Sequence, residues 1–213
     1  MAEPARPVPK FSIGDAVTYG WNACWRNFAP VMLVSLVVLA GDALTVLLSA
    51  ANSSPAMNYA FSLFGALVEV LLVFGLIRAA LEVVEGRTPS LAEAFRPDGY
   101  GPFLVASVLF LLGLYIGLLL LVVPGLIFGL VFQFYGFVVA EHPDAPATVA
   151  LRRSAQITRG ARIRLLGLSV VLLLLNLAGF VVCVVGLVVT YAISAVALAY
   201  VYRLLSGQPV ASL

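Results

Sequence analysis

Four long apolar blocks constrain this 213-residue chain more than any other feature of its sequence. Residues 28–51 and 57–81 are each long enough to cross a bilayer once, because a spanning helix needs about 20 apolar residues. Residues 102–140 and 165–202 would each form a helix of about 60 Å, roughly twice the hydrocarbon thickness of a membrane. Each of these two blocks must therefore turn back, and the chain is predicted to cross the membrane six times.

The composition favours a membrane protein over a water-soluble domain. Hydrophobic residues make up 62% of the chain, charged residues make up 10%, and the mean hydropathy is +1.09. Soluble domains average about 45–50% apolar and about 25% charged residues. Since so few polar residues cannot cover a water-exposed globule, we expect an all-α integral membrane protein.

Proline and glycine indicate where the two long blocks turn. Pro124 and Gly125 lie near the middle of residues 102–140. A proline disfavours the helical conformation of the residue before it, and glycine is common in turns. In residues 165–202 the turn is expected between Gly179 and Gly186. The six spans then form three hairpins. The expected bounds are 1–27 for an N-terminal segment, 28–51, 57–81, 102–123, 125–140, 165–180 and 185–203 for the spans, and 204–213 for a tail.

The distribution of basic residues tests this topology independently. All twelve Lys and Arg residues fall in or beside the N-terminal segment, the connections between hairpins and the C-terminal end. The turns within the hairpins contain none. Because positively charged loops are retained on the cytoplasmic side, both termini are predicted to be cytoplasmic. Arg78, near the end of the second span, is expected to snorkel to the same side.

Five arginines within thirteen residues dominate the connection before the fifth span. The simplest interpretation is that they orient the protein and contact anionic lipid headgroups. A specific phosphate site or partner-protein site is the second interpretation. Nucleic acid is not expected, because no aromatic residue is interleaved with the arginines. The residues are Arg152, Arg153, Arg159, Arg162 and Arg164.

Three polar segments that precede the hairpins are predicted to form cytoplasmic amphipathic helices. In SIGDAV, Ser12 can cap a helix with Asp15 three residues on, and SLAEAF repeats this pattern with Ser90 and Glu93. Apolar residues recur at helical spacing after Ser12, which is typical of a helix lying in the membrane interface. A looser third segment, residues 144–160, is expected to begin with an Asp cap. The order of segment and hairpin indicates a degenerate threefold repeat.

Four short motifs resemble a bacterial superfamily of six-span membrane proteins. They are SIGDAVTYGW, VPGLIFGLVFQFYGFVVAE, ALRRSAQITRG and AYVYRLL. The superfamily includes the YciC-like proteins and the membrane domain fused to some glycerophosphodiester phosphodiesterases. The resemblance implies a place in the bacterial cytoplasmic (inner) membrane and a role in envelope maintenance. The catalytic domain of the fused members has no counterpart in this sequence, so their activity is not implied.

Two carboxylates, Asp42 and Glu69, lie inside predicted spans, where an ionisable residue is costly and points to function. In an antiparallel hairpin their depths would differ by only about 4–5 Å, so they could face each other. Gln133 and Asn176 fall in the same outer half and could join them. One interpretation is a hydrogen-bonded group that holds helices together. The others are a proton or cation pathway and a water-filled cleft of another use.

Two glycine pairs with GxxxG spacing lie on either side of the turn expected in residues 102–140, the second hairpin. Small residues let helix backbones approach closely. Packing within that hairpin is the simplest interpretation, and contact between copies of the chain is the alternative. The residues are Gly113, Gly117, Gly125 and Gly129.

No motif predicts an enzyme, a metal site or a cofactor. The chain has one histidine, His142, and no P-loop, GxGxxG or HExxH motif. Cys24 and Cys183 are expected on opposite sides of the membrane, where they cannot pair. We therefore predict a non-catalytic membrane protein that acts through membrane lipids, a partner protein or a homo-oligomer. The alternative is a small proton- or cation-linked transporter or channel that uses the intramembrane carboxylates.

Overall fold

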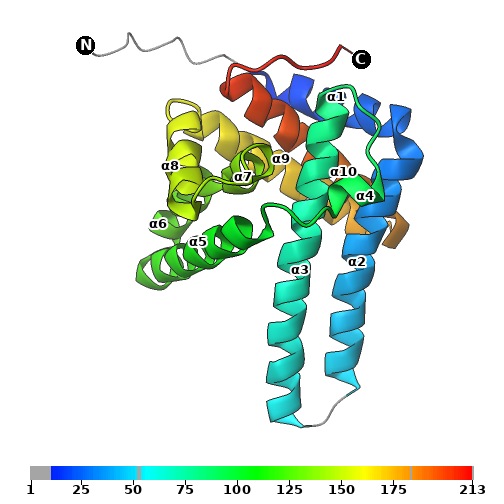
Figure 1. The fold of residues 1–213 in the computed structure, drawn as a ribbon, viewed down its shortest axis with the longest axis vertical. Coiled ribbons are helices and arrows are strands. Elements are labelled where there is room, and N and C mark those ends of the chain that lie inside the picture. Colours follow the sequence, from blue (N-terminus) through cyan, green and yellow to red (C-terminus); the bar gives the residue numbers. More distant parts are fainter. Residues whose placement is uncertain (1–10, 52–53, 183, 213) are drawn as a thin grey trace.

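The computed structural model describes residues 11–51, 54–182 and 184–212, which form ten helices and no strand (Figure 1). Cys183 lies outside these residues. The helices are α1 (Ile13–Arg26), α2 (Phe28–Ala50), α3 (Pro55–Val84), α4 (Leu91–Ala94), α5 (Tyr100–Leu120), α6 (Val122–Phe132), α7 (Tyr135–Glu141), α8 (Ala147–Ile157), α9 (Arg162–Val181) and α10 (Val184–Leu205).

Six helical segments are long and apolar enough to cross a membrane, which confirms the predicted number. Five of them lie in α2, α3, α5, α9 and α10, and the sixth combines α6 and α7 over Val122–Glu141. These segments indicate a multi-pass membrane protein. The sixth is broken at residues 133–134, where backbone groups fall outside the helical hydrogen-bond pattern and need other partners.

The helices differ by a few residues from the bounds predicted for three of the spans. The apolar block of residues 102–140 turns at Leu121, whose extended backbone (φ −166°, ψ 147°) separates α5 from α6. Pro124, the predicted turn, lies instead in the first turn of α6, where helix geometry requires no N–H. The second span continues beyond its predicted end at residue 81, because α3 runs on to Val84.

Two of the three predicted amphipathic segments carry the expected caps. The Asp15 N–H donates to Ser12 Oγ at 3.4 Å, and the Glu93 N–H donates to Ser90 Oγ at 3.2 Å. The helix after Ser90 is only the four-residue α4. The third expected cap was wrong: α8 begins after Pro146, whose fixed φ suits a helix entrance, so Asp144 lies outside it.

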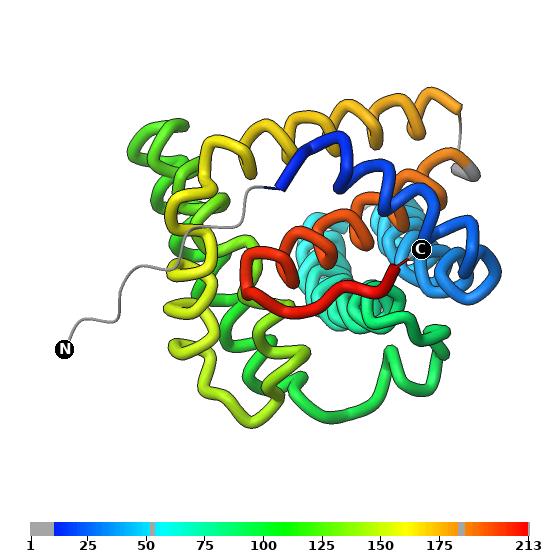
Figure 2. Tube along the Cα trace, turned by 90° about the horizontal axis from the view of Figure 1, so that it is seen from above, coloured from blue at the N-terminus to red at the C-terminus, as the bar shows by residue number. Residues whose placement is uncertain are grey.

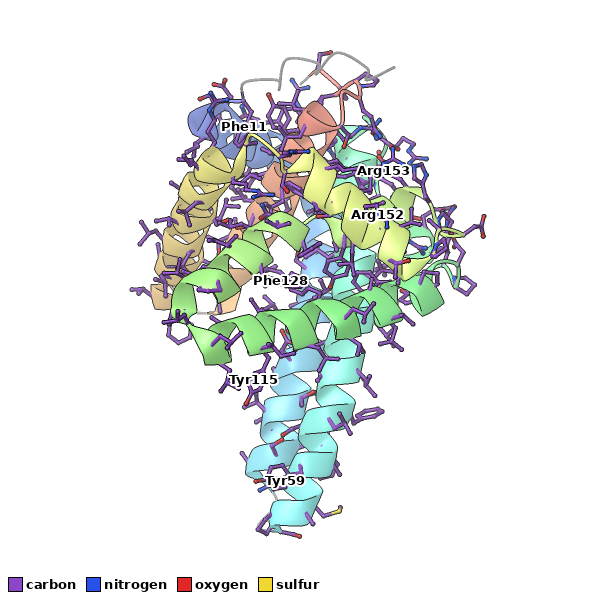
Figure 3. All side chains as sticks on the ribbon, turned by 90° about the vertical axis from the view of Figure 1, so that its left-hand side faces the viewer. Phe11, Tyr59, Tyr115, Phe128, Arg152 and Arg153 are labelled. Atoms are coloured by element: carbon purple, nitrogen blue, oxygen red, sulfur yellow. The ribbon has the colours of Figure 1, made fainter. Side chains whose placement is uncertain are left out.

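The pairs of consecutive spans are not parallel to one another. α2 and α3 lie side by side and project from the rest of the molecule (Figure 1). In the view of Figure 2 they are seen end-on, whereas α9 and α10 run across the picture. α5 crosses in front of α2 and α3 in Figure 3. The far half of the α2–α3 pair is therefore widely exposed, as at Leu47, Tyr59 and Leu63.

α10 is the most buried of the six spans and lies at the centre of the packing. α1 packs along it, and a Cβ on Gly20 would lie 2.8 Å from the carbonyl oxygen of Ile193. The chain after α10 returns over the same end of the molecule. There the Ala211 N–H donates to the Val84 carbonyl at 2.9 Å, and the Tyr19 hydroxyl donates to the Ala211 carbonyl at 3.1 Å. These contacts tie both ends of the described chain to α3.

Candidate functional site

The arginine-rich segment forms an open hollow between α8 and α9, which we call the arginine groove. Gly160 has φ 87°, a left-handed conformation that glycine adopts at little cost, and it turns the chain from α8 into α9. The hollow has a volume of about 920 Å³. Its lining residues are Arg152, Ala155, Gln156, Arg159, Gly160, Arg162, Ile163 and Arg164.

The arginine groove is strongly positive. Four of the five arginines of the segment line it, while Arg153 is half-buried and does not. Within the part of the chain that the structure describes, no carboxylate lies within 4.0 Å of any of the four. The groove also contains the N-terminus of the 20-residue helix α9, whose free N–H groups and dipole favour an anion. Figure 3 shows Arg152 and Arg153 on α8, at the opposite end of the molecule from Tyr59.

The polar residues on the inner side of α8 have a structural role that the sequence analysis missed. Ser154 is fully buried against the break between α6 and α7. Its hydroxyl accepts from the Phe134 N–H at 3.1 Å and donates to the Val131 carbonyl at 3.1 Å. The Thr158 hydroxyl donates to the same carbonyl at 3.1 Å. α8 thus supplies the hydrogen bonds that the broken helix lacks.

Asp42 and Glu69 line one face of the α2–α3 pair, in a hollow of about 660 Å³ that we call the carboxylate groove. Thr45, Ser49 and Ser62 line it with them, and no basic residue does. In the described residues no hydrogen bond joins the two carboxyl groups. The groove lies on an open face of the pair, so Glu69 is exposed and Asp42 is partly exposed.

Gln133 and Asn176 do not join the carboxylates. They line a different space of about 430 Å³, which we call the interhelical cavity. α3, α5, α7, α9 and α10 contribute its walls. Asp42 and Glu69 share one hollow, but Gln133 and Asn176, which were expected to join them, line another. The steep crossing of the helix pairs separates them.

Arg78 does not snorkel, and that prediction was wrong. Its side chain is 5% exposed and donates hydrogen bonds to the backbone carbonyls of Arg96, at 2.6 Å, and of Asp98. It also lies 3.3 Å from the Asp98 carboxylate, and its guanidinium is 4.4 Å from the centre of the Phe74 ring. Arg78 is buried because it fastens the connection between α3 and α5 onto α3.

A second charged network holds the chain after α10. The Tyr202 hydroxyl and the Gln208 amide donate to the Glu141 carboxylate at 2.7 and 2.9 Å. Arg203 forms an ion pair with Glu85 and lies 3.8 Å from Glu141. This network is not apparent from the sequence, because each carboxylate is 61 residues or more from the side chains that bind it. Each carboxylate in it already has a partner within the chain.

His142 and Cys24 have side chains that can bind a metal or act as nucleophiles. His142 lines a polar hollow of about 450 Å³ together with Glu141 and Arg203. No group of three metal-ligating side chains occurs in the described ranges. Burial raises the pKa of the Cys24 thiol to about 12, so the thiol stays protonated at neutral pH.

The four glycines with GxxxG spacing lie within the α5–α6 pair. A Cβ on Gly117 would lie 2.9 Å from the Gly125 Cα, and one on Gly113 would overlap the Phe128 ring. The space beside Gly129 is ordinary, with Leu114 as the nearest neighbour at 3.6 Å. The closest approach of α5 and α6 is therefore at Gly117 and Gly125, next to the turn at Leu121.

Comparison with known proteins gives a family and no activity. A family model described as a domain of unknown function, DUF7847, matches residues 16–211. The uncharacterized protein Rv2560 of Mycobacterium tuberculosis (strain H37Rv) is 30% identical over 233 residues, which cover 94% of this chain and 70% of that protein. The uncharacterized protein Mb2590 of Mycobacterium bovis matches with the same identity and coverage. No solved structure matches significantly. These matches give no support for the YciC-like or phosphodiesterase-associated families.

Proposed function

Because the chain belongs to the DUF7847 family, a domain of unknown function with mycobacterial members, we propose its role from its own geometry. The proposed role is that of a non-catalytic, multi-pass protein of the bacterial inner membrane. It binds anionic lipid headgroups through the arginine groove, on the cytoplasmic side.

One observation carries this proposal: among the described residues, the four arginines of the groove have no carboxylate partner, whereas four arginines elsewhere do. Arg78, Arg87, Arg96 and Arg203 each form an ion pair with a carboxylate. In the groove, the described structure places no carboxylate beside any of the four guanidinium groups. A cluster of like charges is self-repelling and is stabilised by an external anion. The groove therefore has the charge of a receptor for phosphate groups.

The surroundings of the groove favour a lipid phosphate. A guanidinium presents a planar fork of donors that matches a phosphate group. Ile163 lines the groove with 88% of its surface exposed, and Leu166 follows on α9 with 43% exposed. An apolar surface beside a cluster of arginines matches an amphiphile, with its phosphate in the groove and its chains along α9. The basic residues also favour the cytoplasmic leaflet, which is rich in anionic lipid.

The proposal predicts how the affinity for a short-chain phosphatidylglycerol changes in the purified, detergent-solubilised protein. Arg159→Gln/Arg162→Gln removes two exposed guanidinium groups of the groove. Since exposed charge pairs contribute about 0.2–1 kcal/mol each, the affinity should fall about tenfold. The binding should also weaken as salt is raised. Titration monitored by intrinsic tryptophan fluorescence or calorimetry gives the affinity.

The matched control is Arg87→Gln/Arg96→Gln, which removes the same charge from two exposed, ion-paired residues outside the groove. It should leave the affinity within about twofold of the wild type. Short-chain phosphatidylcholine should bind weakly to all three proteins, and soluble glycerol phosphate should compete poorly if the chains contribute. Equal loss of affinity in both double variants would mean that only net charge matters, and the groove would not be a site.

The carboxylate groove supports a second candidate function, a proton- or cation-linked pathway. Asp42 and Glu69 lie along one hollow with three hydroxyl side chains, and no basic residue neutralises them there. Carboxylates placed in this way inside spans are typical of proton relays and ion pathways. In the described residues the carboxylate groove is open along one face, so this function needs either a second copy of the chain or another protein over that face.

This second candidate predicts a flux. Liposomes that contain the wild-type protein should take up protons or sodium ions when a gradient is applied, and Asp42→Asn/Glu69→Gln should abolish that uptake. Ser49→Ala/Ser62→Ala, in the same groove, is the matched control and should retain most of it. Uptake that is indistinguishable from protein-free liposomes would remove the candidate, provided that the protein is shown to be folded by its melting temperature.

A further inference from the structure

The arginine groove holds more positive charge than one lipid phosphate can balance. Four guanidinium groups line it, and among the described residues no carboxylate lies within 4.0 Å of any of them. The phosphodiester of a lipid such as phosphatidylglycerol carries a single negative charge and would leave three of these charges unbalanced. Because like charges repel each other, the groove is better suited to a ligand that carries more than one phosphate group.

The positive charge is also spread along the groove. Arg152 lies on α8 (Figure 3), seven residues before Arg159, so the two backbones are about 10 Å apart along α8 and the turn that follows it. Gln156 lies between them, four residues after Arg152, and residues at this spacing share one side of a helix. The groove therefore presents two exposed guanidinium groups with an amide between them.

The end of the groove beside α9 has further donors for an anion. The N-cap residue of α9 is Ala161, which has no polar side chain to cap the helix. The N–H of Leu165 donates to the Ala161 carbonyl at 2.9 Å, whereas the N–H groups of residues 162–164 come too early in the helix to have helical partners. Arg159 and Arg162 flank this end. We call it the corner subsite, because the chain turns there from α8 into α9.

The two ends match a headgroup in which two phosphates are joined by a glycerol. One phosphate would lie in the corner subsite and the other at Arg152. The free hydroxyl of the glycerol would lie at Gln156, whose amide can both donate and accept a hydrogen bond. Basic pockets beside transmembrane helices on the cytoplasmic side are typical sites for headgroups of this kind.

α9 offers a surface for the acyl chains of such a lipid. Exposed apolar residues continue from the groove along one side of this helix, at intervals of three and four positions. They are Ile163, Leu166, Val170, Leu173 and Leu177.

We infer that the arginine groove binds a lipid with two phosphate groups joined by a glycerol, which is the headgroup of cardiolipin. This inference rests on the proposed function and goes further, because it names a headgroup and gives Arg152 a role distinct from that of the corner subsite. Phosphatidylglycerol, with one phosphate, fills only the corner subsite.

The first test compares three lipids on the purified wild-type protein in detergent, at about 150 mM salt. Tetramyristoyl cardiolipin should bind at least about tenfold more tightly than dimyristoyl phosphatidylglycerol, because its second phosphate binds within the same molecule. Dimyristoyl phosphatidic acid, which can carry two charges on a single phosphate, should bind within about threefold of phosphatidylglycerol. Equal affinities for cardiolipin and phosphatidylglycerol would overturn the inference. So would equal affinities for cardiolipin and phosphatidic acid, because headgroup charge alone would then decide.

The second test removes the Arg152 subsite, since cardiolipin also differs from phosphatidylglycerol in its number of chains. Arg152→Glu, at an exposed position, should lower the affinity for cardiolipin at least about tenfold. It should leave the affinity for phosphatidylglycerol within about twofold, because a charge about 10 Å from the corner subsite is largely screened at this salt concentration. Arg152→Gln should give a smaller loss in the same direction. An equal loss for both lipids would contradict a separate subsite at Arg152.

The matched control is Arg26→Glu, which makes the same change at an exposed residue of α1 outside the groove. It should leave both affinities within about twofold, and the melting temperature of each variant shows that it is folded. Arg159→Gln/Arg162→Gln should weaken both lipids, because both use the corner subsite. If the wild type bound both lipids equally, the proposed function would stand and this inference would fail. If neither lipid bound more tightly than phosphatidylcholine, both would fail.

Discussion

Arg78→Leu is expected to lower the free energy of unfolding by about 3 kcal/mol, because it removes two charge-assisted hydrogen bonds from a buried site. The guanidinium holds the carbonyls of Arg96 and Asp98, which lie on the connection between α3 and α5. A leucine at this position keeps apolar contact with Phe74 but leaves the carbonyls without donors. Reversible unfolding in mixed micelles, followed by circular dichroism, measures the change.

Two variants show whether the effect belongs to the buried guanidinium. Arg78→Lys should lose an intermediate amount, because one ammonium group cannot reproduce the planar fork that reaches both carbonyls. Arg96→Leu should cost at most about 1 kcal/mol, since Arg96 is 47% exposed and its ion pairs with Glu93 and Asp98 face solvent. A neutral Arg78→Leu would show that this side chain lies at the membrane interface, as the sequence alone predicted.

Ser154→Ala is expected to lower the free energy of unfolding by about 2 kcal/mol, because it leaves the buried Phe134 N–H without an acceptor. The Val131 carbonyl should stay paired, since Thr158 also donates to it. The loss of stability should also be visible at the break between α6 and α7 itself. We expect hydrogen exchange at the Phe134 amide to speed up by at least about tenfold if the break opens more often.

The control for this prediction is Gln156→Ala, an exposed position on the same helix. Its unfolding free energy should change by less than about 0.5 kcal/mol, as is usual for surface substitutions. If Ser154→Ala were equally neutral, the two segments α6 and α7 would not depend on α8 for their backbone hydrogen bonds.

The length of the apolar blocks was enough to predict the number of spans. Two blocks were too long for one crossing, so six helices followed from the bilayer thickness alone. The position of one turn did not follow, because proline fits two places equally well: a turn and the first turn of a helix. Pro124 occupies the second. The non-parallel arrangement of the helix pairs also lay beyond the sequence, since apolar residues on nearly every face give no direction for packing.

The features of the candidate sites also differed in how far the sequence could predict them. The cluster of arginines could be recognised, because five like charges in one short segment are visible without a fold, but the groove between α8 and α9 could not. The similar depths of Asp42 and Glu69 could also be predicted, and Gln133 and Asn176 were expected to join them. The sequence could not show that Gln133 and Asn176 line a different space from the two carboxylates. Nor could it show that Arg78 would be buried, because its partners are backbone carbonyls, which every residue offers.

The central claim, that the arginine groove selects anionic lipid, is tested most directly by native mass spectrometry of protein released from bilayers that contain equal amounts of phosphatidylglycerol and phosphatidylcholine. We predict that the wild type and Arg87→Gln/Arg96→Gln retain mainly phosphatidylglycerol, and that Arg159→Gln/Arg162→Gln retains the two lipids in similar amounts. Equal retention of phosphatidylglycerol by all three proteins, or no preference in the wild type, would contradict the claim.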